Sequence, residues 1–142
     1  MARIDYQTQV TTQQEYFSDF LSSFDKSPLS NDLARIRNEN SVKQSVRNLI
    51  LTDLGERICQ PNVGGNVNRL LFEPFTGFTA DDLKKDILNT IRQNEPRVSA
   101  TDLSVSVIPN LDQNQMTVNV LFYIINDSST QISLSLVLQR VR

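Results

Sequence analysis

The fold is decided near the end of the chain by three segments that alternate apolar and polar residues: LSVSV (103–107), MTVNVLFYI (116–124) and ISLSLVL (132–138). Successive side chains of a β-strand point to opposite faces, so this alternation predicts three half-buried strands. The connections, residues 110–115 and 126–130, are short and polar, which favours hairpins. The sequence therefore predicts a three-stranded antiparallel meander with one apolar face.

Two helices are expected before this meander. The first runs from about Asn40, its N-cap, to Leu54, with Gly55 as its stop. The second begins at a Thr79 cap and ends before Pro96, which disfavours helical geometry at the preceding residue. Apolar residues recur at helical spacing in both: Val42, Val46, Leu49, Ile50 and Leu54 in the first, and Leu83, Ile87, Leu88 and Ile91 in the second. We therefore expect an α+β fold with two main helices packed on one face of the meander.

The chain before the first helix is expected to form an arm. Residues 1–14 are rich in Gln and Thr and are expected to be extended. A set of apolar residues at helical spacing then predicts a short aromatic helix: Tyr16, Phe17, Phe20, Leu21 and Phe24. Its partner is either the chain's own core or a neighbouring subunit, and the spacing leaves both open. We expect residues 1–30 to form the arm and residues 31–142 a single α+β domain, with a capped turn at 31–37 and room for a short strand at 57–60.

Composition excludes several classes of function. The net charge is −2, so nothing supports binding of nucleic acid. Histidine is absent and Cys59 is the only cysteine, which excludes an internal disulfide and a zinc site built from His and Cys. Residues 1–10 lack the apolar core of a secretory signal. The longest apolar run, 118–125, is far shorter than the roughly 20 residues that span a bilayer. We expect no cofactor, no metal, no membrane partner and a reducing compartment.

Glu56, Glu73 and Glu95 are the carboxylates that a catalytic interpretation would use. Glycosidases hold two carboxylates at a fixed separation, so a peptidoglycan hydrolase is the alternative to a structural role. Each of the three, however, lies beside a proline or an arginine at the boundary of an expected element, where structural ion pairs are common. We therefore assign no catalytic residue and expect the chain not to be an enzyme.

Glu95-Pro96-Arg97 occupies the corner where the second helix must stop and a strand must start. Proline fixes the backbone there, and arginine offers a planar set of donors suited to bidentate pairing. Two interpretations remain. The two charges either close on each other as a local ion pair, which the spacing alone favours, or they face another subunit.

Several motifs, taken in order, resemble one known family. They are Asn48-Leu49-Ile50-Leu51-Thr52, Gly55-Glu56-Arg57, Pro61, Gly64, Leu70-Leu71-Phe72-Glu73 and Glu95-Pro96-Arg97, with Asp19-Phe20, Phe24, Pro28 and Asp32-Leu33 upstream. This set resembles the small baseplate wedge proteins of contractile-tailed phages, which have counterparts in type VI secretion systems and an old label as tail lysozymes. The chain departs from the family pattern at Ile58 and Cys59, where many members have a proline and an aromatic residue, and at Val63, where an aromatic is common.

The resemblance implies a structural subunit of the virion tail baseplate, made in the cytoplasm of the bacterial host. It implies that Glu95, Pro96 and Arg97 clamp the helical core bundle of the larger wedge subunits. It also implies contact with the tail sheath protein, whose interlocking domain the family's sheet resembles, and nucleation of the sheath. Tube or hub proteins are further candidate partners. The family's characteristic loop corresponds to Gly55, Glu56, Arg57, Pro61, Gly64 and Glu73.

The last predicted strand, 132–141, supplies the candidate edge for joining the sheath. We expect no later segment to cover it, and unpaired N–H and C=O groups at a sheet edge invite a partner strand. Its outward face has few charges that would discourage pairing; it holds Ser133, Ser135, Val137 and Gln139. The predicted joining residues are Ile132, Ser133, Leu134, Ser135, Leu136, Val137 and Leu138. The alternative is that the N-terminal arm hides this edge.

Overall fold

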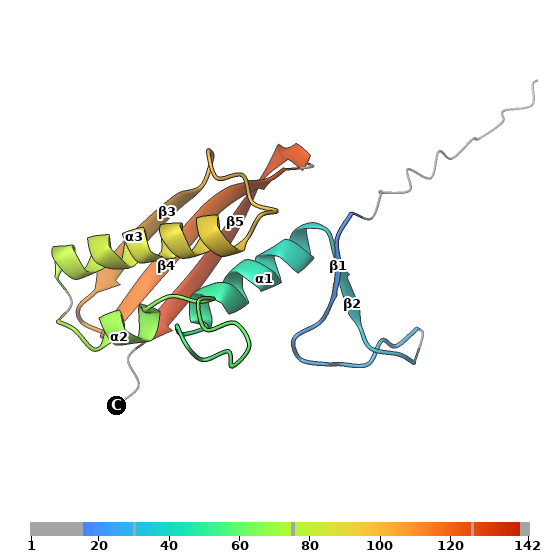
Figure 1. Ribbon diagram of the computed structural model, residues 1–142, viewed down its shortest axis with the longest axis horizontal. Helices are drawn as coiled ribbons and strands as arrows, with labels where there is room; N and C mark the ends of the chain where they lie inside the picture. The colour runs from blue at the N-terminus through green and yellow to red at the C-terminus, as the bar shows by residue number, and fades with distance from the viewer. Residues whose placement is uncertain (1–15, 30, 75, 126, 140–142) are drawn as a thin grey trace, which may run out of the picture.

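A three-stranded sheet with two long helices on one of its faces forms the body of the chain (Figure 1). The computed structural model describes residues 16–29, 31–74, 76–125 and 127–139. The expected extended arm, 1–14, and the end of the expected last strand, 140–141, lie outside the described residues. The predicted α+β class, with two main helices packed on an antiparallel meander, is confirmed.

The sheet has the predicted order: β3 (Ser104–Asn110), β4 (Gln115–Ile124) and β5 (Asp127–Gln139) pair antiparallel. Every second residue of β4 is buried, as half-buried strands require. The second hairpin is tighter than expected. β5 begins inside the predicted connection 126–130, because Asp127 already faces Ile124 across the turn.

The two long helices, α1 (Glu39–Leu51) and α3 (Gly77–Asn94), bury the predicted stripes on the sheet. α3 lies against β3 and α1 lies against β5, so each covers one side of the same sheet face (Figure 1). Their apolar side chains join those of the strands in one core, which includes Val46, Ile50, Leu83, Ile87, Met116 and Phe122. Burying each such side chain contributes roughly 1.5–3 kcal/mol, which fixes both helices on the sheet.

The first helix is displaced from its predicted bounds by tertiary contacts. It begins after Asn38 rather than at Asn40, because the Asn38 side chain accepts hydrogen bonds from the backbone N–H of Tyr16 (2.9 Å) and Phe17 (3.3 Å). It ends at Leu51 rather than Leu54, since the next residue is extended. Leu54 is consequently outside the helix and 47% exposed.

The second long helix begins earlier than predicted. Thr76 is its N-cap and accepts the Thr79 backbone N–H at 3.3 Å, so the expected cap lies inside the helix. The Thr79 hydroxyl is engaged elsewhere, donating to the carbonyl of Pro74 at 2.7 Å. A short helix that the sequence pattern does not predict, α2 (Val67–Leu71), precedes it and buries its first and last residues. The short strand expected at 57–60 does not form; these residues make an exposed turn.

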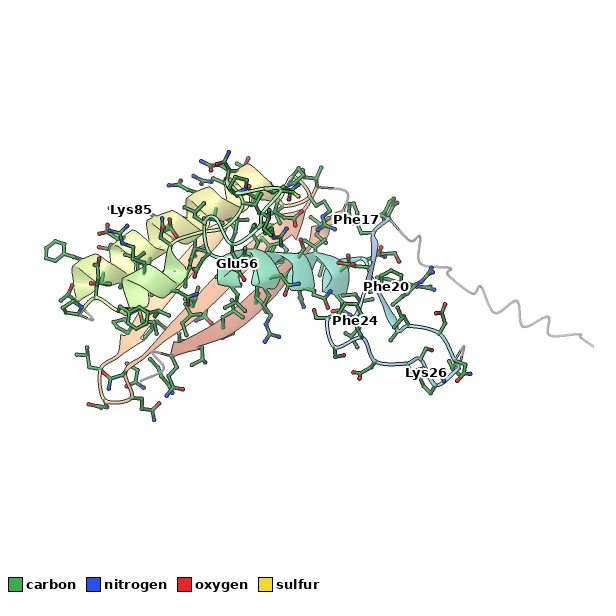
Figure 2. All side chains as sticks on the ribbon, turned by 60° about the horizontal axis from the view of Figure 1, so that its bottom comes forward. Phe17, Phe20, Phe24, Lys26, Glu56 and Lys85 are labelled. Carbon is green, nitrogen blue, oxygen red and sulfur yellow. The ribbon has the colours of Figure 1, made fainter. Side chains whose placement is uncertain are left out.

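The predicted aromatic helix is wrong. Its residues instead form β1 (Ser18–Phe20), which pairs antiparallel with β2 (Arg35–Arg37), where a capped turn was expected. A helix this short has few hydrogen bonds to offset its nucleation cost, whereas strand pairing and the Asn38 contacts hold the extended form. Phe17 packs against the core, while Phe20 and Phe24 stay 45% and 70% exposed at the β1–β2 end of the molecule (Figure 2).

Candidate interaction surfaces

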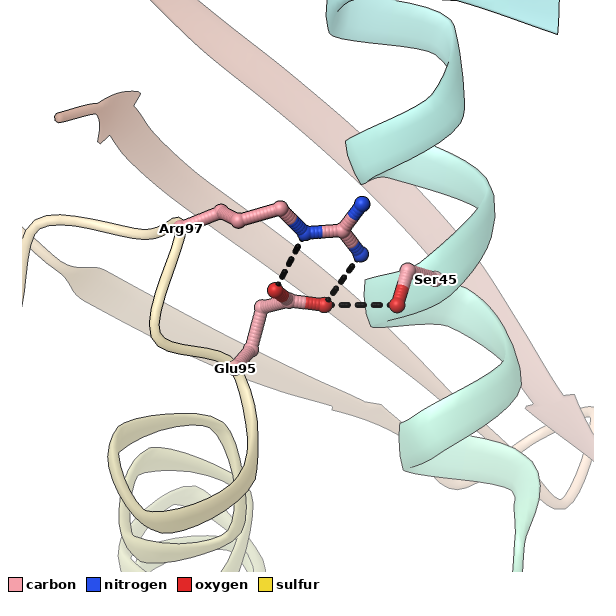
Figure 3. A network of polar contacts seen from close by, with 3 residues as sticks. All are labelled: Ser45, Glu95 and Arg97. Atoms are coloured by element: carbon pink, nitrogen blue, oxygen red, sulfur yellow. Dashed lines mark hydrogen bonds and ion pairs between the residues drawn. The ribbon is translucent and has the colours of Figure 1, made fainter. Parts of the chain in front are cut away.

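Glu95 stands where α3 ends, and only 4% of it is exposed. Arg97 donates from Nε to Oε1 at 2.7 Å and from Nη2 to Oε2 at 2.8 Å (Figure 3). The hydroxyl of Ser45, on α1, donates to Oε2 at 2.5 Å. The carboxylate therefore points into the protein and ties the end of α3 to α1. The local ion pair, one of the two interpretations of this spacing, is present.

Burial by itself raises the pKa of the Glu95 carboxyl, because it removes the charged form from water. Hydrogen bonds from Arg97 and Ser45, together with the Arg97 charge, outweigh burial and hold that pKa below its ordinary value. The hydrogen bond to Glu95 in turn raises the pKa of the Arg97 guanidinium. The general acid of a glycosidase needs its pKa shifted upward instead. Glu95 thus has the properties of an ionised structural partner.

The corner also reaches the N-terminal segment. The Arg97 guanidinium carbon lies 5.5 Å from the centre of the Phe17 ring, within cation–π range. The charge of Asp19, in β1, further favours the protonated guanidinium and adds to the rise of its pKa. Pro96 is exposed and 28% of the Arg97 side chain is accessible. Any partner of this corner would therefore touch Pro96 and Arg97, with Glu95 behind them.

Most of the predicted loop residues lie between α1 and α2, where backbone geometry dominates. Gly64 has a φ of +128°, and an added Cβ would lie 2.5 Å from the carbonyl oxygen of Thr52, so only glycine fits. Gly55, with a φ of +83°, donates its N–H to the Pro61 carbonyl at 2.9 Å. Glu56 accepts the backbone N–H of Asp53 at 2.9 Å. Arg57 and Glu73 are exposed.

Two hydrogen bonds attach this loop to α3. The Thr90 hydroxyl donates to the Gly64 carbonyl at 3.4 Å, and the Asn66 backbone N–H donates to Asp86 Oδ2 at 2.8 Å. Gly65 lies so close to α3 that an added Cβ would come within 2.8 Å of Asp86 Oδ2. The loop thus holds α1, α2 and α3 in place, and the two glycines allow the close approach.

β5 is the last strand of the sheet and pairs with β4 on one side. Its outer edge has no partner strand among the described residues. The predicted faces are confirmed: Ile132, Leu136 and Leu138 are buried, Leu134 is partly buried, and Ser133, Ser135, Val137 and Gln139 are exposed. Whether residues 1–15 cover the edge lies outside the described residues.

The register decides which residues of β5 direct their N–H groups toward this edge. Tyr123 and Ile125 form backbone hydrogen bonds with Ser99 and Arg97, on the side of β4 away from β5. Backbone groups of consecutive strand residues point to opposite edges, so the even-numbered residues of β4 bond to β5. Pro109 of β3 is consistent with this assignment, because it faces the even-numbered Met116 and proline has no N–H to donate to β4.

The same alternation extends to β5. Leu134 and Leu136 face Val120 and Val118, and therefore bond inward to β4. The residues that direct N–H and C=O groups to the free edge are Ser133, Ser135 and Val137. The sequence alone gives the alternation of faces but not this assignment.

Each of the three candidate carboxylates has its own surroundings. Glu95 is held by Arg97 and Ser45, Glu56 by a backbone N–H, and Glu73 is exposed. Within the described ranges no hydrogen bond or ion pair joins any two of them. The same ranges contain no cluster of His, Cys, Asp or Glu suited to a metal ion, and none of their helices is long and apolar enough to cross a membrane.

Ser45 completes the corner without a clear signal in the sequence. It lies 50 residues from Glu95 along the chain, so no local spacing connects them. The available hint is that Ser41 and Ser45 interrupt the buried side of α1 at helical spacing, and such residues often serve a buried polar group. The contribution of Phe17 to the corner is missed for the same reason.

Comparison with known proteins gives a consistent set of matches. Residues 37–128 match the family described as "Baseplate wedge protein gp25". The baseplate wedge protein gp25 of Enterobacteria phage T4 is 35% identical over 107 residues, which cover 74% of this chain and 80% of that protein.

Solved structures show the same fold. The putative tail lysozyme from Geobacter sulfurreducens has a TM-score of 0.63 at 19% identity, covering 72% of this chain and 92% of that one. A chain of the anti-feeding prophage baseplate has a TM-score of 0.60 at 22% identity, covering 88% and 87%. At these identities the likeness establishes the fold alone.

Proposed function

The chain belongs to the family of the baseplate wedge protein gp25, and we propose that, as a structural subunit of a contractile-tail baseplate, it couples the wedge core to the sheath. In this proposal one surface clamps the helical bundle of the larger wedge subunits, and another starts the sheath by accepting a strand. Tube or hub proteins are further candidate neighbours. No catalytic step is part of this function.

The observation that carries the proposal is the outer edge of β5. It is long and has no partner strand among the described residues, and its outward face holds Ser133, Ser135 and Val137. Natural proteins usually protect such an edge with charge, proline or a covering segment. From Ser133 to Gln139 the described edge carries no charge and no proline, so it is suited to strand addition, in which backbone hydrogen bonds give affinity and alternate side chains give specificity.

The corner is proposed as the clamp on the core bundle. Its ion pair makes the turn after α3 rigid, because Glu95 bonds to both Arg97 and Ser45. The groups left for a partner are the Pro96 ring and the accessible part of the Arg97 side chain. Arginine retains donor capacity beyond its two bonds to Glu95, since the guanidinium carries five N–H groups.

The clamp is tested by a change that leaves the ion pair intact. Pro96→Asp places a carboxylate on the exposed turn beside Glu95 without removing any described hydrogen bond. We expect a folded protein that no longer co-purifies with the core-bundle subunits, whereas Lys84→Asp, an exposed change on α3, co-purifies as wild type. Normal co-purification of the Pro96→Asp variant would refute the clamp.

The edge is tested by comparing proline at neighbouring positions of β5. Ser135→Pro removes an N–H that faces the free edge, so we expect a folded subunit that enters the baseplate. Leu134→Pro removes an N–H bonded to β4 and a partly buried side chain, so we expect it to unfold. Tails carrying Ser135→Pro should show complete baseplates and tubes without sheath in negative-stain microscopy. A normal sheath on those tails would rule out this edge as the nucleation site.

A further inference from the structure

A groove of about 480 Å³ lies between α1 and β5, the strand whose outer edge has no partner strand among the described residues. Leu134 lines it from the sheet, and the turn after β1 contributes Leu21 at one end. The helix contributes Lys43, Gln44, Arg47 and Leu51. The groove therefore joins the sheet edge to the exposed flank of α1.

The side chains that α1 contributes to the groove follow a definite order of charge and polarity. Lys43, Arg47 and Leu51 are four residues apart, so they form one row along α1. Neither Lys43 nor Arg47 forms an ion pair within the described residues, although the whole chain carries a net charge of −2. Gln44 is already engaged, accepting the backbone N–H of Ser22 and donating to the Phe20 carbonyl. Two cationic side chains and then an apolar residue are thus presented toward the edge.

A strand added to β5 would direct every second side chain into this groove. The residue opposite Leu134 would have its side chain on the same face of the sheet as Leu134, which is the face that α1 covers. Residues on either side of it would face solvent, beside Ser133 and Ser135. The inward side chains of the added strand therefore meet the row on α1.

The spacings of the row and of a strand agree. Four residues of helix rise about 6 Å, and two residues of strand rise about 6.6 Å. α1 and β5 run in broadly similar directions, so consecutive inward side chains of an added strand would meet consecutive members of the row (Figure 1).

We propose that the strand accepted by β5 carries acidic residues at two alternate positions, facing Lys43 and Arg47, and an apolar residue two positions further, facing Leu51. This inference rests on the proposed strand addition and specifies the partner's chemistry. Charge complementarity of this kind sets register and suppresses wrong partners. The chain's own first fifteen residues do not fit, because their acidic residues, Asp5 and Glu15, are ten positions apart.

The test uses the full-length chain and two fluorescent peptides. The acidic probe has the sequence Thr-Glu-Thr-Glu-Thr-Val-Thr, and the basic probe has lysine in place of both glutamates. We expect the acidic probe to bind the wild type at least about tenfold more tightly at low salt, as fluorescence anisotropy would show. Lys43→Glu with Arg47→Glu should reverse the preference. Lys84→Glu with Arg92→Glu, the matched change on the exposed side of α3, should leave it unchanged.

Equal binding of the two probes, or an unreversed preference in the Lys43→Glu, Arg47→Glu variant, overturns the proposal. So does the absence of binding by either probe, the result expected if residues 1–15 fill the groove. A tail-assembly assay distinguishes failure of the proposed charge pattern from failure of the proposed function. If Ser135→Pro abolishes the sheath while the Lys43→Glu, Arg47→Glu variant assembles it normally, the charge rule fails and the β5 edge stands. If Ser135→Pro assembles a normal sheath, the proposed function itself fails.

Discussion

Arg97→Ala is expected to destabilise the fold strongly, because it removes the charged partner of a buried carboxylate. Glu95 is 4% exposed and would keep neutral partners, the Ser45 hydroxyl and the backbone of residue 97. Removing one member of a buried pair typically costs about 3–5 kcal/mol. Because 28% of the Arg97 side chain is accessible, water can enter where it is truncated. We therefore expect a loss of about 3 kcal/mol, at the low end of that range.

Urea unfolding followed by circular dichroism measures this loss. With a slope of about 2 kcal/mol per molar urea, the midpoint should fall by about 1.5 M. Lys84→Ala, an exposed change on α3, is the control and should leave the midpoint in place. Adding Glu95→Gln to Arg97→Ala should recover part of the loss, because the buried charge is then removed. A urea midpoint for Arg97→Ala within about 0.3 M of the wild-type midpoint, roughly the experimental scatter, would show that the ion pair does not stabilise the fold.

Three further outcomes are expected. Gly64→Ala should destabilise by about 2 kcal/mol in the same urea assay, since its Cβ would collide with backbone at positive φ, whereas Gly77→Ala, with open space around it, should not destabilise. The pKa of Glu95 is lower in the folded than in the unfolded protein, so its ionised form stabilises the fold above the unfolded-state pKa, and this stabilisation is lost as pH falls through the folded-state pKa. The free energy of unfolding of the wild type should therefore drop below about pH 4.5 more steeply than that of Glu95→Gln. Purified wild type and Glu95→Gln should both fail to clear a peptidoglycan suspension, and robust clearing that Glu95→Gln abolishes would restore the hydrolase alternative.

The sheet could be predicted because its signal is local. Period-two alternation assigns the inward residues of β4 and of β5 from Ile132 onward, and burial against two helices enforces that assignment. The helical stripes of α1 and α3 are equally local. Helix ends depend instead on contacts from elsewhere, such as those of Asn38 with Tyr16 and Phe17, which no spacing within the helix reveals.

The site is predictable in its residues but not in its geometry. The sequence marks Glu95 and Arg97 as a pair, yet Ser45 enters from a different helix and places the carboxylate inside the protein. β1 and β2 are too short to show an alternation. The direction of the N–H groups of Ser133 and Ser135 depends on register across the sheet, which a single strand does not contain.

A density map of the intact tail would show directly whether a strand is added at β5. We expect a strand of the sheath protein about 4.8 Å from β5, hydrogen-bonded to the backbone of Ser133, Ser135 and Val137. Its inward side chains would lie along Lys43, Arg47 and Leu51. An edge covered by the chain's own residues 1–15, or left bare beneath an assembled sheath, would contradict strand addition at β5.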